Sequence, residues 1–74
     1  MNNPTSTDTQ QEVQTALMQD SLTGEYGIEV LDSNGVITLK GVVPSREVSE
    51  RAEVIARGID GVQGVINELE LGLF

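Results

Sequence analysis

Alternating apolar and polar residues indicate two strands joined by a tight turn in the middle of the chain. Residues 26–32 and 36–43 are rich in β-branched and aliphatic side chains, and Asn34-Gly35 separates them. An Asn-Gly pair is a strong hairpin signal, because a type I′ turn requires positive φ at both central residues. The sequence therefore predicts an antiparallel hairpin in which Ser33 lies opposite Val36.

This register sorts the hairpin side chains onto two faces. It places Leu31 opposite Thr38, and Glu29 opposite Lys40, so that unlike charges meet on one face. The other face is apolar throughout and is expected to be buried. Its members are Ile28, Val30, Ile37, Leu39, Gly41 and Val43.

Helical periodicity appears on both sides of the hairpin. Thr9 and Glu12 have the spacing of a capping box, which predicts a helix from Thr9 to about Gln19. Its apolar stripe is narrow and consists of Val13, Ala16 and Leu17. The polar segment before it, residues 1–8, is expected to be disordered.

A second helix is predicted from Arg46 to about Arg57, after Pro44 ends the strand and Ser45 provides an N-cap. Gly58 is expected to be the left-handed residue of a Schellman ending. The buried stripe of this helix comprises Val48, Ala52, Ile55 and Ala56, and its i,i+4 ion pairs are Glu47–Arg51 and Glu53–Arg57.

The last strand is predicted over residues 64–71, followed by a short tail, residues 72–74. Its inward positions are Val65, Asn67, Leu69 and Leu71. Asn67 is unusual there, because a buried amide needs hydrogen-bond partners. We expect it to bond to the backbone of a loop or helix end, and a ligand contact is the less favoured alternative.

The element order is α-β-β-α-β. A right-handed crossover would make the second and third strands parallel. We therefore expect an α+β domain, an αββαβ two-layer sandwich over residues 9–71 with both helices on one face of a three-stranded mixed sheet in the order 1-2-3. An antiparallel sheet in the order 2-1-3 is the alternative.

Composition narrows the function classes. The chain has 74 residues, no Cys and no His, which excludes Ser-His-Asp triads and Cys/His zinc sites. Its net charge is −8, so nucleic acid is not an expected partner and membrane binding is disfavoured, whereas cations are attracted. The N-terminus lacks the features of a signal peptide, and a cytoplasmic location is expected.

No residue pattern indicates catalysis or a cofactor. Gly58, Gly61 and Gly64 follow a helix and precede a strand, the reverse of a dinucleotide-binding loop. The segment 32–35 lacks most ligands of a calcium loop. Neighbouring acids such as Glu68 and Glu70 fit a solvated sheet face. We expect a protein that is not an enzyme and assign no metal ligands.

Two motifs resemble those of the BON domain, the module named for bacterial osmotic-stress and nodulation proteins. They are the strand Gly35-Val36-Ile37-Thr38-Leu39-Lys40-Gly41 and the ending Gly61-Val62-Gln63-Gly64-Val65-Ile66-Asn67-Glu68-Leu69. The resemblance implies an αββαβ fold and a non-catalytic binding module. It also implies association with a cation or small ligand, with partner domains such as LysM, or, as the alternative, with phospholipid at the envelope in a stress response.

The sheet face opposite the helices is the predicted partner surface. A protein partner or weak self-association is expected there, because several aliphatic residues stand among charged ones. The candidate residues are Glu29, Leu31, Val36, Thr38, Lys40 and Ile66.

Overall fold

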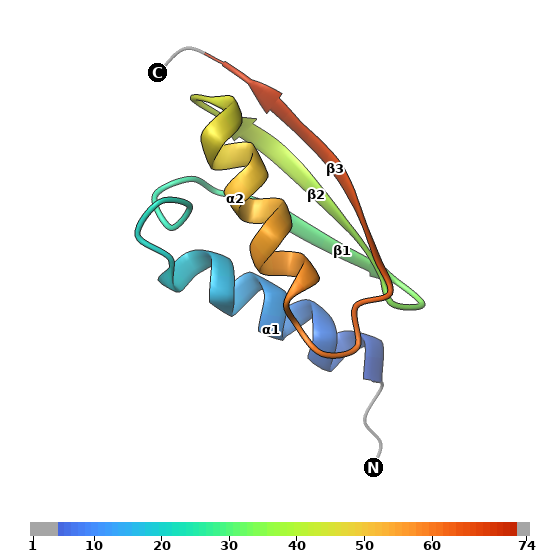
Figure 1. The fold of residues 1–74 in the computed structure, drawn as a ribbon. Coiled ribbons are helices and arrows are strands. Elements are labelled where there is room, and N and C mark those ends of the chain that lie inside the picture. The colour runs from blue at the N-terminus through green and yellow to red at the C-terminus, as the bar shows by residue number, and fades with distance from the viewer. Residues whose placement is uncertain (1–4, 73–74) are drawn as a thin grey trace.

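The computed structural model describes residues 5–72, which form two helices and a three-stranded sheet (Figure 1). The elements are α1 (Thr5–Gln19), β1 (Glu29–Ser33), β2 (Val36–Val43), α2 (Arg46–Arg57) and β3 (Gly64–Leu71). This arrangement confirms the predicted α+β class and the αββαβ order. The tail residues 73–74 and the segment 1–4 lie outside the described residues.

The hairpin forms as predicted. Asn34 and Gly35 have φ values of 55° and 91°, as a type I′ turn requires. Ser33 pairs with Val36, which confirms the register. The Asp32 carboxylate also accepts a hydrogen bond from the Gly35 N–H at 2.9 Å. The Asn-Gly pair therefore fixes which hairpin residues face the helices.

Strand β1 starts at Glu29, three residues later than the predicted Tyr26. The Ile28 N–H donates to the Tyr26 carbonyl at 2.8 Å, and the Tyr26 N–H donates to Thr23. These local bonds hold residues 23–28 in turns, so the chain becomes extended only after Ile28.

The sheet order is β1-β2-β3, with β2 in the centre. Strands β1 and β2 are antiparallel, and β2 and β3 are parallel, with Val36 beside Gly64 and Val43 beside Leu71. The mixed sheet is confirmed, and the alternative order 2-1-3 is wrong. Helix α2 makes the crossover, and both helices lie on the same face of the sheet (Figure 1).

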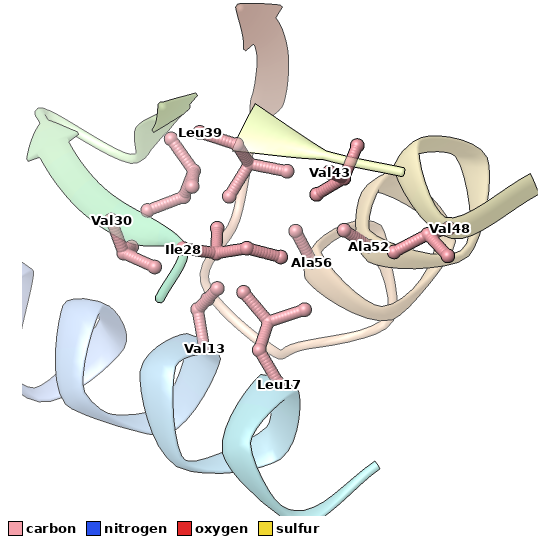
Figure 2. Close-up of a cluster of buried hydrophobic side chains, with 10 residues drawn as sticks. Val13, Leu17, Ile28, Val30, Leu39, Val43, Val48, Ala52 and Ala56 are labelled. Carbon is pink, nitrogen blue, oxygen red and sulfur yellow. The ribbon is translucent and has the colours of Figure 1, made fainter. Parts of the chain in front are cut away.

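The core lies between the sheet and the two helices (Figure 2). Leu39 and Val43 of the central strand are fully buried, and so are Ala52 and Ala56 of α2. The small alanine side chains let α2 approach the sheet closely. The whole buried set comprises Val13, Leu17, Ile28, Val30, Ile37, Leu39, Val43, Val48, Ala52 and Ala56. Leu71, predicted to face inward, is instead 56% exposed at the strand end.

Helix α1 begins at Thr5, so the predicted start at the Thr9 capping box is wrong. Thr9 lies inside the helix and is 5% exposed. The preceding residues, Thr5-Ser6-Thr7-Asp8, are all N-cap residue types, so the sequence offers several alternative starts.

Helix α2 has the predicted bounds, and the Ser45 hydroxyl accepts a hydrogen bond from the Val48 N–H. The Schellman ending is wrong, because Gly58 has a right-handed φ of −81°. Its N–H donates to the carbonyls of Val54 and Ile55, so the helical bonding continues through Gly58. The left-handed turn comes later, at Gly61, with φ of 95°.

An ion pair ties α2 to the loop after α1. Arg51 donates to the Asp20 carboxylate at 2.7 Å, rather than to the predicted partner Glu47. The other Asp20 oxygen accepts the backbone N–H groups of Leu22 and Thr23. The bond from Arg51 lowers the pKa of the Asp20 carboxyl, against the smaller opposing effect of burial. The Arg57 pair with Glu53 is confirmed at 2.6 Å.

Candidate functional site

The helices leave one face of the sheet open, and the predicted partner surface lies on that face. We call this surface the open face. It contains all six predicted residues, Glu29, Leu31, Val36, Thr38, Lys40 and Ile66, together with Val42, Glu68 and Glu70. These residues alternate along the strands with the buried core residues, because successive side chains of a strand point to opposite faces.

The parallel register brings three open-face residues into one row across the sheet. Thr38 of β2 lies between Leu31 of β1 and Ile66 of β3. Leu31 is 39% exposed and Ile66 is 48% exposed. Val36 precedes Thr38 on this face and pairs with Gly64, where an added Cβ would meet open space. We call this group, the row of Leu31, Thr38 and Ile66 together with Val36 beside it on β2, the apolar row.

The next row is charged. Lys40 lies between Glu29 and Glu68, and its Nζ is 3.8 Å from a carboxylate oxygen of Glu68. Lys40 lies opposite Glu29 as predicted, but it forms its ion pair with Glu68 on the other neighbouring strand. Val42 lies beyond this row beside Glu70, so the charges separate it from the apolar row. Sequence reasoning missed Glu68 as the partner of Lys40, because only the parallel register places them side by side.

Asn67 faces the helices, half-buried. Its amide nitrogen donates to the hydroxyl of Ser49 at 2.9 Å, to the Ser49 carbonyl and to the Glu53 carboxylate. These partners lie within α2 rather than in the predicted loop or helix end. The amide oxygen accepts the backbone N–H of Leu69 at 2.9 Å. The side chain thus has partners on both atoms, which supports a structural role over a ligand contact.

The structure does not assemble the acids into a metal centre. Among the side chains that the structure describes, those of residues 9–72, no group of three or more His, Cys, Asp or Glu could hold a metal ion. Segment 32–35 forms the hairpin turn, and Gly58 and Gly61 lie in the turn that follows α2. Neither described helix is both long and apolar enough to cross a membrane.

Comparison with known proteins agrees with these features. The sequence matches the BON domain over residues 5–72, nearly all of the chain. The chain belongs to the BON-domain family. The two motifs of the resemblance occupy neighbouring parallel strands, since the first covers most of β2 and the second leads into β3. The match begins where helix α1 begins, so all five elements belong to the module.

One similar protein is the osmotically-inducible protein Y of Escherichia coli K12. The two sequences are 38% identical over 64 residues, which is 86% of this chain and 32% of the relative. This chain therefore spans about a third of the relative's length. The shared part is the domain, and the relative's remaining length has no counterpart in the alignment.

Proposed function

We propose that this BON domain is a non-catalytic docking module that binds a partner protein on the open face of its sheet. The observation that carries this proposal is the apolar row, in which Leu31 and Ile66 flank Thr38 across all three strands. A solvated sheet face usually carries polar residues. A small apolar centre beside charged residues has the composition of a modest, transient interface.

The charges on this face favour a partner with a basic rim. Three acids, Glu29, Glu68 and Glu70, lie beside the apolar row on one side, toward the C-terminal ends of β2 and β3. Lys40 is the one cation among the strand residues of this face in the described part of the chain. The whole chain carries −8. A second copy would bring the same negative charge, and this repulsion opposes self-association. A lysine- or arginine-rimmed apolar patch complements the open face better.

The similar protein from Escherichia coli is named for osmotic induction. That name supports a role for this domain in the osmotic stress response. We also propose a cytoplasmic location. Cation or small-ligand binding and phospholipid binding are the other functions expected of the family. Their support here is the family membership and, for cations, the net charge of −8.

The test begins by finding what touches the open face. A photo-crosslinking residue replaces Thr38, and a second variant carries it at Val54, which is 63% exposed on helix α2. A protein crosslinked in the source bacterium from position 38 alone is purified. Its affinity is then measured by calorimetry for the wild type and for Leu31→Lys, Ile66→Lys and Val54→Lys.

We expect Leu31→Lys and Ile66→Lys each to weaken binding by about tenfold or more, because a buried lysine replaces an apolar contact and repels a basic rim. Val54→Lys should bind as the wild type does. Equal losses in all three variants, or no loss in the first two, would contradict docking on this face. Binding should also weaken as salt increases.

Further measurements distinguish the other molecules that could bind the domain. If sedimentation shows that the wild type self-associates more strongly as salt increases, and that Leu31→Lys does not self-associate, the open face binds a second copy and not a basic partner. Titration of the 15N-labelled domain with K⁺, Na⁺, Ca²⁺ and Mg²⁺, and with phosphatidylglycerol vesicles, tests the remaining two. Saturable, selective shifts away from the open face would favour a ligand site over docking.

A further inference from the structure

Strand β3 lies at an edge of the sheet and presents a long main-chain edge. It has eight residues, and within residues 5–72 only β2 pairs with it (Figure 1). An unpaired strand edge is a template for the addition of a further strand from another chain. A protein with such an edge needs a feature that keeps the edge from pairing with other chains.

The hydrogen bonding shows which residues of β3 direct their main chain outward. The Gly72 N–H donates to the Val43 carbonyl of β2 at 2.9 Å. Main-chain groups alternate in direction along a strand, so Glu70 and Glu68 also face β2. Their neighbours Leu69 and Asn67 therefore direct their N–H and C=O groups to the free edge.

The Asn67 side chain covers part of that edge. Its amide oxygen accepts the Leu69 N–H at 2.9 Å, so this outward donor is already occupied. The amide nitrogen is held by helix α2 through the Ser49 hydroxyl at 2.9 Å and the Glu53 carboxylate at 3.3 Å. Glu53 is in turn paired with Arg57. The blocking side chain is thus anchored at both of its polar atoms.

The opposite edge has a corresponding contact. In a hairpin with a two-residue turn, Ser33 bonds to Val36, so alternate residues bond to β2 and Val30 directs its carbonyl outward. The Gln10 side chain of α1 donates to this carbonyl at 2.9 Å. An amide side chain therefore occupies a main-chain group on each free edge of the sheet.

We propose that Asn67 and Gln10 close the two sheet edges against the addition of a further strand, with Asn67 the principal block on the longer strand. The domain therefore presents its open face, and not a strand edge, to other proteins. The role of these two amides at the edges holds whether or not a partner binds the open face, because it concerns the association of bare edges.

The test uses Asn67→Val and Asn67→Asp. Valine suits a strand and removes the acceptor of the Leu69 N–H, whereas aspartate keeps an acceptor oxygen at that position. Amide hydrogen exchange followed by NMR reports on Leu69 directly. The amides of Glu68 and Glu70 bond to β2 and serve as internal controls.

We expect exchange at Leu69 to accelerate by about tenfold or more in Asn67→Val, with little change at Glu68 and Glu70. Sedimentation should show concentration-dependent association of this variant, stronger still when combined with Gln10→Leu. Asn67→Asp keeps the acceptor oxygen but loses the donors to Ser49 and Glu53, so Leu69 should be better protected than in Asn67→Val and the variant should associate less.

Two results would overturn the proposal. One is exchange at Leu69 that is the same in Asn67→Val as in the wild type. The other is association that is equal in Asn67→Val and Asn67→Asp, or absent from Asn67→Val combined with Gln10→Leu. Leu31→Lys, added to Asn67→Val, should leave this association intact, which distinguishes association through the edge from association through the open face.

Discussion

The two faces of the sheet carry alternate residues of the same strands, yet one face is buried in the core and the other is open to solvent. Leu39 is fully buried on the inner face, whereas its neighbours Thr38 and Lys40 lie on the open face. The inner face is covered by helices and is aliphatic at Val30, Ile37, Leu39 and Val43. The open face mixes the apolar row with charges. Adjacent positions of one strand thus belong alternately to the core and to the proposed docking face.

Exchange of a core residue for alanine should have the largest effect. Leu39→Ala should destabilise the domain by about 2–5 kcal/mol, because it leaves a cavity in the centre of the core. Thr38→Ala, one position away, should cost about 1 kcal/mol or less. Urea denaturation followed by circular dichroism measures both. Ile37→Val, expected to cost about 0.5–1.5 kcal/mol, provides a milder core variant. Equal losses at positions 38 and 39 would contradict the assignment of the faces.

The hairpin turn decides which residues reach which face. Gly35→Val should destabilise the domain by about 1–3 kcal/mol, because a β-branched residue is strained at the observed φ of 91°. An added Cβ would also lie 3.2 Å from the Gly61 carbonyl oxygen. Thermal melting measures the loss. Ser33→Val, on the strand beside the turn, is the control and should melt near the wild type. An unchanged melting temperature for Gly35→Val would show that the turn tolerates a side chain.

A smaller effect is expected at the Asp20–Arg51 pair, on the helical side of the molecule. The lowered pKa of Asp20 means that its contribution to stability is complete above the unfolded pKa of about 3.9. That contribution is lost as the pH falls through the lower folded-state pKa. The stability difference between wild type and Asp20→Asn should therefore be constant from about pH 7 to pH 5 and shrink below about pH 4.

The midpoint of urea denaturation, measured at several pH values between about pH 3 and pH 7, would test this dependence, because this interval spans the ordinary carboxyl pKa. Glu68→Gln is the matched control from the open face, where the pair with Lys40 is half-exposed on both sides. Exposed pairs contribute little, so this variant should differ little from the wild type at any pH. A difference for Asp20→Asn that widens as the pH falls would contradict the assigned role of the Arg51 bond.

Local sequence determined the hairpin, its register and the bounds of α2 and β3. Asn34-Gly35 requires two left-handed residues, and a two-residue turn leaves one pairing of the flanking residues. Pro44 ends β2 because it has no backbone N–H to donate to the sheet, and Ser45 starts α2 as its N-cap. These signals act over a few residues, so they can be interpreted without knowledge of the rest of the fold.

The partner surface was predicted only in outline. The hairpin register placed Glu29, Leu31, Val36, Thr38 and Lys40 on one face, and the period of β3 added Ile66. The position of Ile66 beside Thr38 and of Glu68 beside Lys40 depends on the parallel register. A parallel pair is joined by a long crossover, and no tight turn fixes its register from local residues.

The remaining contacts were decided by tertiary structure. Arg51 has an acid at i−4, yet it binds Asp20 from the loop after α1. Asn67 bonds to Ser49, and Gln10 bonds to Val30, across separations that no periodic pattern marks. The sequence by itself determined which faces are apolar and where the chain turns, because turn and capping energies are local. Packing of the helices against the sheet decided which polar side chains meet, because long flexible side chains find partners only once the layers are in place.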